Sequence, residues 1–302
     1  MAVAWSIARI ARFTTVTWTF AVAPAPCILR AQTPPQPQSQ NKPVAIERLA
    51  LHQYEDGPVL AAGYEFVPGE TAYFSCRIAA YHIVRNDQQQ SVKLAWQMRV
   101  LDPSGVPIEK DQSGRIEDQL LPQDKSWVPK FITSFVVPAF APGGTYRVTV
   151  KIIDEAGGTE VTGELPFGVR GHEVQPSDTL LARNFLFLRA EDDRRGMSRA
   201  VYHPGETLWA RFDITGYKFG DGNRFSVDYG LAVLRPTGEE LFAQPGAAAD
   251  SNQSFYPQRY VPGMLSLTLD QNVPKGSFLL VVTVHDKIGD QSWETKQPFE
   301  IE

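Results

Sequence analysis

The residues best suited to chemistry are a few scattered histidines, whose spacing does not predict a catalytic or metal site. They are His52, His82, His172, His203 and His285. None forms the His-Glu-x-x-His pair or another spacing typical of zinc hydrolases. The sequence also contains no Gly-x-Ser-x-Gly nucleophile motif, phosphate loop or dinucleotide-binding glycine pattern. We therefore expect no enzymatic activity, cofactor or metal; an enzyme whose site is assembled from loops without a linear motif is the alternative.

The cysteines predict neither a nucleophile nor a disulfide. Cys76 alternates in phase with Phe74 and Ile78, so we interpret it as a small buried apolar residue. The other cysteine, Cys27, falls in the expected leader, which leaves one thiol and no internal disulfide. A protein exported without disulfides depends on its apolar core for stability.

Three acidic loop segments are candidate cation sites. Asp192-Asp193 and Glu239-Glu240 are adjacent pairs, which are typical of solvated loops. Asp221-Gly222-Asn223 is rich in oxygen atoms, but its spacing differs from that of a calcium loop. A calcium site in an interstrand loop is the alternative, and it would need further oxygen ligands from elsewhere in the fold.

The N-terminus predicts export. Residues 1–31 combine two early arginines with an uncharged apolar run, Phe13 to Ala23, and small residues before Ala31, as in a secretory signal peptide. A membrane anchor is the alternative, but the run is shorter than a span and ends at Pro24. Lipid attachment at Cys27 is a further alternative, disfavoured by the proline before it. We expect a periplasmic or extracellular protein with no membrane span in the mature chain.

The composition after the leader indicates a linker and a globular region. Residues 32–43 are rich in proline and glutamine and predict a disordered linker. Removing the leader takes away three arginines and no acid, which changes the net charge from −5 to −8. This balance argues against a nucleic-acid partner, because phosphate binding needs concentrated Lys and Arg.

The remaining chain repeats itself. Tyr202-His-Pro-Gly-Glu-Thr207 matches Phe66-Val-Pro-Gly-Glu-Thr71 at a shift of 136 positions. Leu101-Asp-Pro-Ser-Gly105 matches Leu234-Arg-Pro-Thr-Gly238 at a shift of 133. A shift that changes so little indicates one domain fold used twice rather than a solenoid unit of roughly 20 to 50 residues.

Both copies carry the period-two pattern of half-buried β-strands. Matched apolar sets are Ala72, Phe74, Cys76, Ile78 with Leu208, Ala210, Phe212, Ile214, and Leu94, Trp96, Met98, Val100 with Val227, Tyr229, Leu231, Val233. The segments 146–152 and 278–284 repeat the pattern. Six or seven strands per copy with turns between them predict two tandem antiparallel sandwiches, residues 44–170 and 177–302, in an all-β protein. We expect Trp96 or Tyr229 to be the buried central aromatic.

A strand entered through Tyr/Phe-x-Pro-Gly-Glu-Thr and followed by Leu-x-Pro-x-Gly resembles macroglobulin-type and other immunoglobulin-like modules of exported bacterial proteins. The closing Gly-x-Tyr/Phe-x-Leu/Val-x-Val pattern before an aspartate adds to the resemblance. It covers both copies and implies an immunoglobulin-like fold and a location outside the cytoplasm. It does not imply protease trapping, because the chain lacks the Cys-Gly-Glu-Gln thioester element.

The outward strand positions suggest what the protein binds. Tyr73 and Trp209 occupy matched positions on the polar side of their strands, while Leu279 and Val281 make one strand apolar on both faces. These four residues are our candidate contact surface, with packing by a loop or by the other domain as the alternative. We expect a binding or scaffold protein with a protein partner in the cell envelope. Carbohydrate binding through the outward aromatic residues is the second hypothesis.

Overall fold

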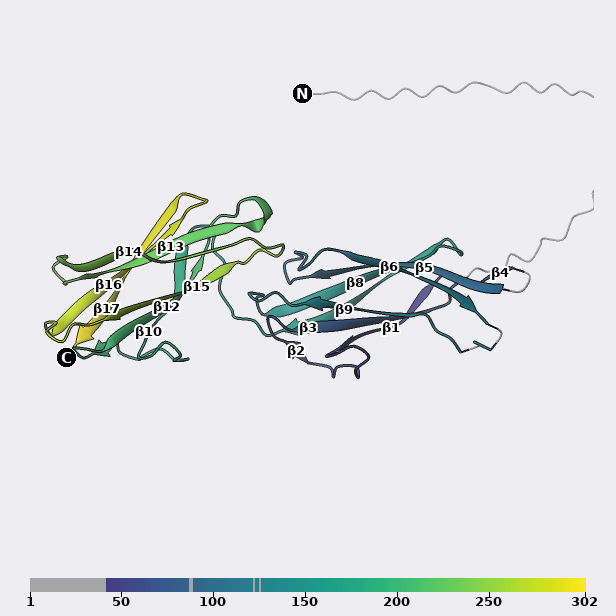
Figure 1. Ribbon diagram of the computed structural model, residues 1–302, viewed down its shortest axis with the longest axis horizontal. Helices are drawn as coiled ribbons and strands as arrows, with labels where there is room; N and C mark the ends of the chain where they lie inside the picture. The colour runs from purple at the N-terminus through teal and green to yellow at the C-terminus, as the bar shows by residue number, and fades with distance from the viewer. Residues whose placement is uncertain (1–41, 87–88, 122, 125) are drawn as a thin grey trace, which may run out of the picture. The chain divides into compact units, whose positions relative to one another are not determined.

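The computed structural model describes residues 42–86, 89–121, 123–124 and 126–302, and in these residues the chain is built from β-strands. The only other regular element in this part is a 3₁₀ turn, η1 at Asp221–Asn223. Figure 1 shows the strands grouped in several sheets. The expected all-β class is therefore confirmed.

The first nine strands, which we call the N-terminal half, form two sheets. They are β1 Ala45–His52, β2 Glu65–Phe66, β3 Thr71–Ala79, β4 Val84–Asn86, β5 Gln89–Leu101, β6 Gln112–Leu120, β7 Lys130–Val136, β8 Gly144–Asp154 and β9 Thr159–Val169. One sheet has the order β1-β3-β7. The other has the order β2-β9-β8-β5-β4, with β6 also paired to β5. All pairs are antiparallel except β2 with β9.

The C-terminal half repeats this arrangement with eight strands. They are β10 Leu181–Leu188, β11 Val201–Tyr202, β12 Thr207–Thr215, β13 Phe225–Leu234, β14 Glu240–Asn252, β15 Tyr260–Thr268, β16 Gly276–Asp286 and β17 Gln291–Ile301. The sheets are β10-β12-β15 and β11-β17-β16-β13-β14. Each sheet therefore has a counterpart in the other half, and only the short strand β4 has none.

The alternating patterns identified the core correctly. The residues at even positions of β3 and β12, from Ala72 to Ile78 and from Leu208 to Ile214, are fully buried. In each half, side chains from both sheets form one apolar cluster. Tyr229 is buried as expected, but Trp96 is only half-buried and packs at the margin of its cluster. Its indole stacks on Phe131 with ring centroids 4.2 Å apart and contacts Gly114 of the outer strand β6.

The duplicated Pro-Gly-Glu-Thr segment forms a turn before a strand in both halves. Gly69 and Gly205 have φ values of 85° and 87°, which disfavour residues with a Cβ atom. The N–H groups of Glu70 and Glu206 donate to the carbonyls three residues earlier. The following strands begin at Thr71 and Thr207, as predicted.

Three strands that the sequence analysis did not anticipate lie at sheet edges. These are β4, β6 and β14, and all three are exposed along most of their length. An edge strand solvated on both faces needs no alternation, so the periodicity carries no signal for it. The short parallel strands β2 and β11 were missed as well, because two residues are too few to show a period.

Some sequence predictions lie beyond the described chain. The expected signal peptide, and the linker up to residue 41, fall outside the described residues. The expected domain boundary lies in the strand-free segment between β9 and β10. Within the described residues, we find no helix that is long and apolar enough to cross a membrane.

Candidate functional site

The two outward aromatic residues occupy equivalent strands, as predicted, and both are half-buried. Tyr73 on β3 lies between His52 and Ser134 of the neighbouring strands. Trp209 on β12 lies between Leu188 and Ser266 in the same way. Leu188 shares this outward face but is fully buried, so this face of the sheet is covered in part.

Trp209 forms one wall of a surface recess of about 360 Å³, which we call the Trp209 recess. Its lining residues are Arg189, Ala190, Glu191, Tyr202, Glu206, Thr207 and Trp209. Three segments supply them: the loop after β10, the strand β11 with its turn, and the start of β12. The recess therefore combines one indole with two carboxylates and one guanidinium.

The Glu206 carboxylate is held in its charged form. The backbone N–H of His203 donates to Glu206 Oε2 at 2.8 Å, and this bond lowers the pKa of Glu206 despite slight burial. The His203 side chain and the Arg189 guanidinium lower the pKa of Glu206 further. Burial raises the pKa of Tyr202 to about 12, and its hydroxyl donates to the Leu188 carbonyl. Tyr202 thus lines the recess as an apolar ring.

The matched carboxylate of the N-terminal half is occupied differently. Glu70 Oε1 accepts a hydrogen bond from the Tyr64 hydroxyl at 2.5 Å, and Glu70 Oε2 accepts one from the Val67 N–H. At the shift of 136 the counterpart of Tyr64 is Ala200, which has no hydroxyl group. The duplication therefore kept the turn and its glutamate but changed the neighbours of the carboxylate: Glu206 Oε2 lies 3.5 Å from His203 Nδ1, and Glu206 lines the Trp209 recess.

Leu279 and Val281 lie on β16, in the other sheet of the C-terminal half, so the four candidate contact residues do not form one patch. Val281 is 5% exposed and Leu279 is half-buried. Val281 lines a recess of about 390 Å³ together with Ala232, Ala243 and Lys296. It is therefore a wall residue rather than an exposed contact.

The edge strand β14 is a second feature that the sequence analysis missed. Its hydrogen-bonded neighbour in the sheet is β13, and β14 is the terminal strand of the described sheet order. Leu241 and Phe242 are 39% and 41% exposed. The stretch from Leu241 to Ala249 contains no charged residue, and Pro245-Gly246 lies at a bulge near its middle. The signal available in the sequence was this uncharged run between Glu240 and Asp250.

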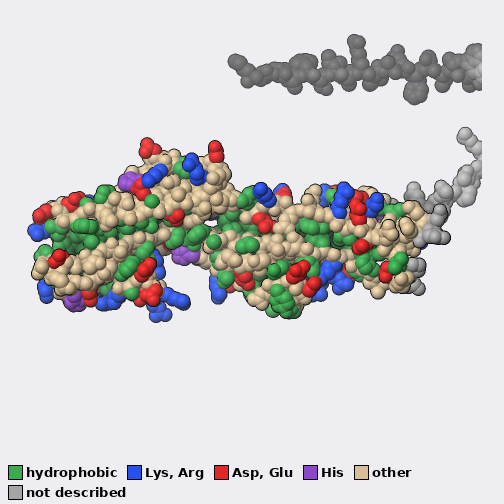
Figure 2. All heavy atoms as spheres, viewed as in Figure 1, with side chains coloured by type: hydrophobic (Ala, Val, Ile, Leu, Met, Phe, Trp, Pro, Cys, Tyr) green, Lys and Arg blue, Asp and Glu red, His purple; other side chains and the backbone are tan. Residues whose placement is uncertain are grey.

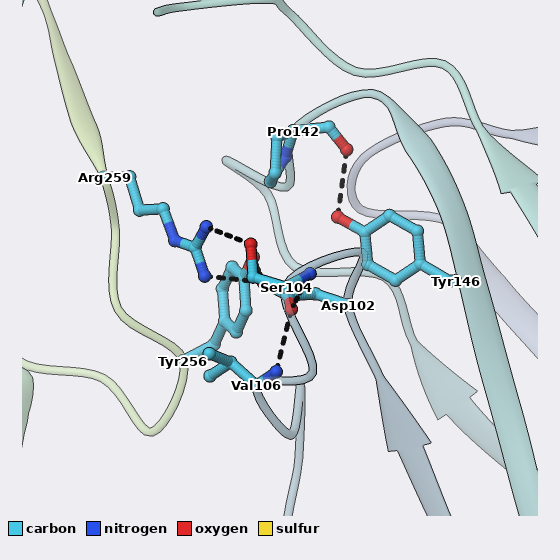
Figure 3. Close-up of polar contacts among 7 residues, drawn as sticks. All are labelled: Asp102, Ser104, Val106, Pro142, Tyr146, Tyr256 and Arg259. Carbon is cyan, nitrogen blue, oxygen red and sulfur yellow. Dashed lines mark hydrogen bonds and ion pairs between the residues drawn. The ribbon is translucent and has the colours of Figure 1, made fainter. Parts of the chain in front are cut away.

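A buried polar contact joins the two halves. The Asp102 side chain is fully buried, and its Oδ1 accepts hydrogen bonds from the Ser104 and Val106 N–H groups, both at 2.8 Å. Its Oδ2 accepts the Tyr256 hydroxyl at 2.9 Å and Arg259 Nη2 at 2.6 Å. Figure 3 shows these groups converging on the carboxylate from two separate segments. These four groups thus donate hydrogen bonds to a carboxylate that is fully buried.

Tyr256 also connects the halves through its ring. It comes from the loop between β14 and β15, yet it packs in the apolar cluster of the N-terminal half. Burial raises the pKa of the Tyr256 hydroxyl, and the nearby Asp102 carboxylate adds to the shift. The guanidinium of Arg259 lies 5.9 Å from the centre of the Tyr256 ring, within the range of cation–π attraction. We call Asp102, Tyr256 and Arg259 the joint.

A histidine–aspartate pair involves the segment between β9 and β10. His172 Nε2 is 2.8 Å from Asp213 Oδ2, and the Asn184 side-chain amide donates to the same oxygen at 2.7 Å. Asn184 has a φ of 51°, a left-handed conformation that asparagine tolerates better than most residues. The pair ties the segment after β9 to β12, and its oxygen is already bound twice. This arrangement fits a role in positioning the segment between β9 and β10.

The remaining histidines and the buried thiol complete the groups considered for chemistry. His52 Nε2 lies 2.8 Å from the Ser75 hydroxyl, and His82 Nδ1 lies 3.2 Å from Asp154 Oδ2. Cys76 is fully buried, and burial raises its pKa to about 12, which keeps it as an unreactive thiol. Asp154 and Asp286 are also buried, and their carboxylates accept backbone N–H groups of the hairpin turns that follow. No group of three metal-binding side chains occurs among the described residues, including the acidic loop segments.

The surface carries charges of both signs. Figure 2 shows acidic and basic side chains interspersed over the visible face, without a broad area of either sign. Asp228 on β13 illustrates this mixing, because it pairs with Lys287 at 2.9 Å and with His285 at 2.8 Å. Partial burial would raise the pKa of Asp228, but its hydrogen bonds with Lys287 and His285 outweigh that effect and lower it.

Comparisons with known proteins do not assign a family. No protein-family model matches the chain, and no curated protein matches it. One similar solved structure is the Pseudomonas fluorescens alkylpurine DNA glycosylase AlkC bound to DNA containing an abasic site analog. It is 12% identical over 43% of this chain and 31% of that enzyme, with a TM-score of 0.28. Similarity at this level carries no argument about function.

Proposed function

We propose that this protein is an exported, non-enzymatic binding or scaffold protein built from two immunoglobulin-like sandwiches. The matching sheet orders of the two halves support this reading, with a three-stranded sheet facing a larger one around a shared apolar cluster. Tyr146 adds support, because its hydroxyl donates to the Pro142 carbonyl four residues upstream. Such a tyrosine corner recurs in immunoglobulin-like domains at this strand. The leader predicts the periplasm or the extracellular space.

The partner is a protein of the cell envelope, and the observation that carries this proposal is the open edge of β14. An edge strand presents unpaired N–H and C=O groups that an extended segment of another protein can join. Protein edges are normally blunted by charged side chains, yet Leu241 to Ala249 carries none. The exposed Leu241 and Phe242 add apolar contact area, while Pro245 restricts pairing to either side of the bulge.

The test is site-specific photocrosslinking in cells that produce the protein. A photoreactive residue at Leu241 is expected to form a discrete adduct with an envelope protein, identified by mass spectrometry. The matched control places the same residue at Glu117 on β6, an edge strand that carries charges. Phe242→Lys should abolish the adduct without unfolding the protein, because this side chain is exposed. Equal adducts at both edges, or an adduct that Phe242→Lys leaves unchanged, would contradict the proposal.

A further inference from the structure

The geometry points to a second binding site, in which the Trp209 recess holds a neutral sugar ring. The recess is lined by β12, β11 and the loop after β10, whereas the protein-binding edge proposed above is the strand β14, which supplies none of its lining residues. The inference therefore does not depend on the β14 proposal. The Trp209 recess has a volume of about 360 Å³, at the lower end of the range for ligand pockets, which suits a monosaccharide or disaccharide unit.

The lining chemistry matches a ring that has one apolar face and a rim of hydroxyl groups. The C–H face of a pyranose packs on an indole, and Trp209 supplies the indole. Carboxylates accept hydrogen bonds from sugar hydroxyls, and a guanidinium donates to them. Glu206, Glu191 and Arg189 supply these acceptors and donors around the indole.

The same groups disfavour other ligands. An anion would meet two carboxylates, and a purely apolar ligand would desolvate Glu206 without returning a hydrogen bond. A methylated ammonium group is the strongest competitor, because indoles and carboxylates attract cations. Arg189 in the same recess opposes that cation. The mixed signs therefore favour an uncharged hydroxyl-rich ligand.

The duplication shows that the two matched carboxylates have different surroundings. In the N-terminal half, Tyr64 donates to the matched carboxylate of Glu70, which uses one of its oxygens internally. Ala200 replaces that tyrosine in the C-terminal copy, and the recess lies beside Glu206. Tyr73, the counterpart of Trp209, therefore provides a matched control within the same molecule.

The test is a binding screen with the purified full chain. The probes are immobilised neutral oligosaccharides of glucose, mannose, galactose and N-acetylglucosamine, followed by calorimetric titration with the free sugars that bind. Trp209→Ala is expected to weaken binding by roughly tenfold, the upper range for loss of one aromatic stacking contact. Glu206→Gln should weaken it as well, whereas Tyr73→Ala should leave it unchanged.

The controls separate binding from folding and one ligand source from another. Trp209→Phe keeps an aromatic ring in place, so it should retain part of the affinity and the wild-type melting temperature even if Trp209→Ala unfolds. Binding of polymer but not of free sugar would assign the site to an envelope polysaccharide, and binding of both to a soluble sugar. The inference is overturned if no sugar binds, if Trp209→Phe and Glu206→Gln leave affinity unchanged, or if only choline and trimethyl-lysine bind.

Discussion

The joint between the two halves gives the sharpest quantitative prediction. Tyr256→Phe removes the hydroxyl that donates to the fully buried Asp102 carboxylate, and it keeps the ring in the apolar cluster. A hydrogen bond to a charged group contributes about 1.5–3 kcal/mol to stability. Asp102 retains Arg259 and two backbone donors in this variant. We therefore expect a loss near the lower limit, about 1.5 kcal/mol.

Asp102→Ala should cost more than Tyr256→Phe, because it removes the shared acceptor of the joint. The Tyr256 hydroxyl would lose its acceptor, and Arg259 would lose its ion pair while it still donates to Ser104 Oγ at 3.1 Å. Breaking a buried ion pair costs about 3–5 kcal/mol. Arg259 is 31% exposed and can regain water, so we expect the lower part of this range. In the double variant, Tyr256→Phe removes a hydroxyl whose acceptor is already absent because of Asp102→Ala. The total cost of the double variant should therefore equal that of Asp102→Ala alone, a coupling of about 1.5 kcal/mol.

The assay is urea unfolding of the full chain, followed by tryptophan fluorescence for wild type, both single variants and the double variant. Tyr202→Phe is the matched control, because it removes a buried hydroxyl that donates to the Leu188 carbonyl within the C-terminal half. Tyr202→Phe and Asp102→Ala should be additive. If Tyr256→Phe and Asp102→Ala were also additive, the joint would not stabilise the protein and the reasoning would be refuted.

Three further predictions concern single residues. Cys76 should resist alkylation in the native protein at pH 8 and react on unfolding, as read by intact mass, because burial raises its pKa to about 12; rapid native labelling would contradict this. Asp228→Asn should reduce the free energy of unfolding at pH 7. Since the pKa of Asp228 is lowered on folding, its contribution is present above the ordinary value of about 3.9 and is lost as the pH falls through the lower, folded value. The difference from wild type should therefore shrink below about pH 4, and a constant difference would exclude the effect. Mass spectrometry of protein isolated from producing cells should find Gln32 at the N-terminus, and an uncleaved leader would refute the predicted signal peptide.

The sequence by itself predicted the strands whose two faces differ. Phe74, Cys76 and Ile78 alternate with more polar residues because one face of β3 meets the core, and the structure buries these three residues completely. The Pro-Gly-Glu-Thr turns were equally readable, since φ near +85° at Gly69 requires glycine locally. Comparing the halves with each other strengthened both predictions, because matched positions had to serve the same fold.

Only the tertiary structure decided which elements became neighbours. The strand β14 showed no period because it is an edge, and Trp96 is half-buried because it packs beside β6 rather than at the centre. Asp102 and Arg259 are 157 positions apart, and neither residue type predicts a buried ion pair from the sequence. The alternation of apolar and polar residues shows only which residues of one strand face the core and which face solvent. Contacts between distant loops, such as the joint and the Trp209 recess, depend on how whole sheets pack, and no local pattern in the chain encodes that.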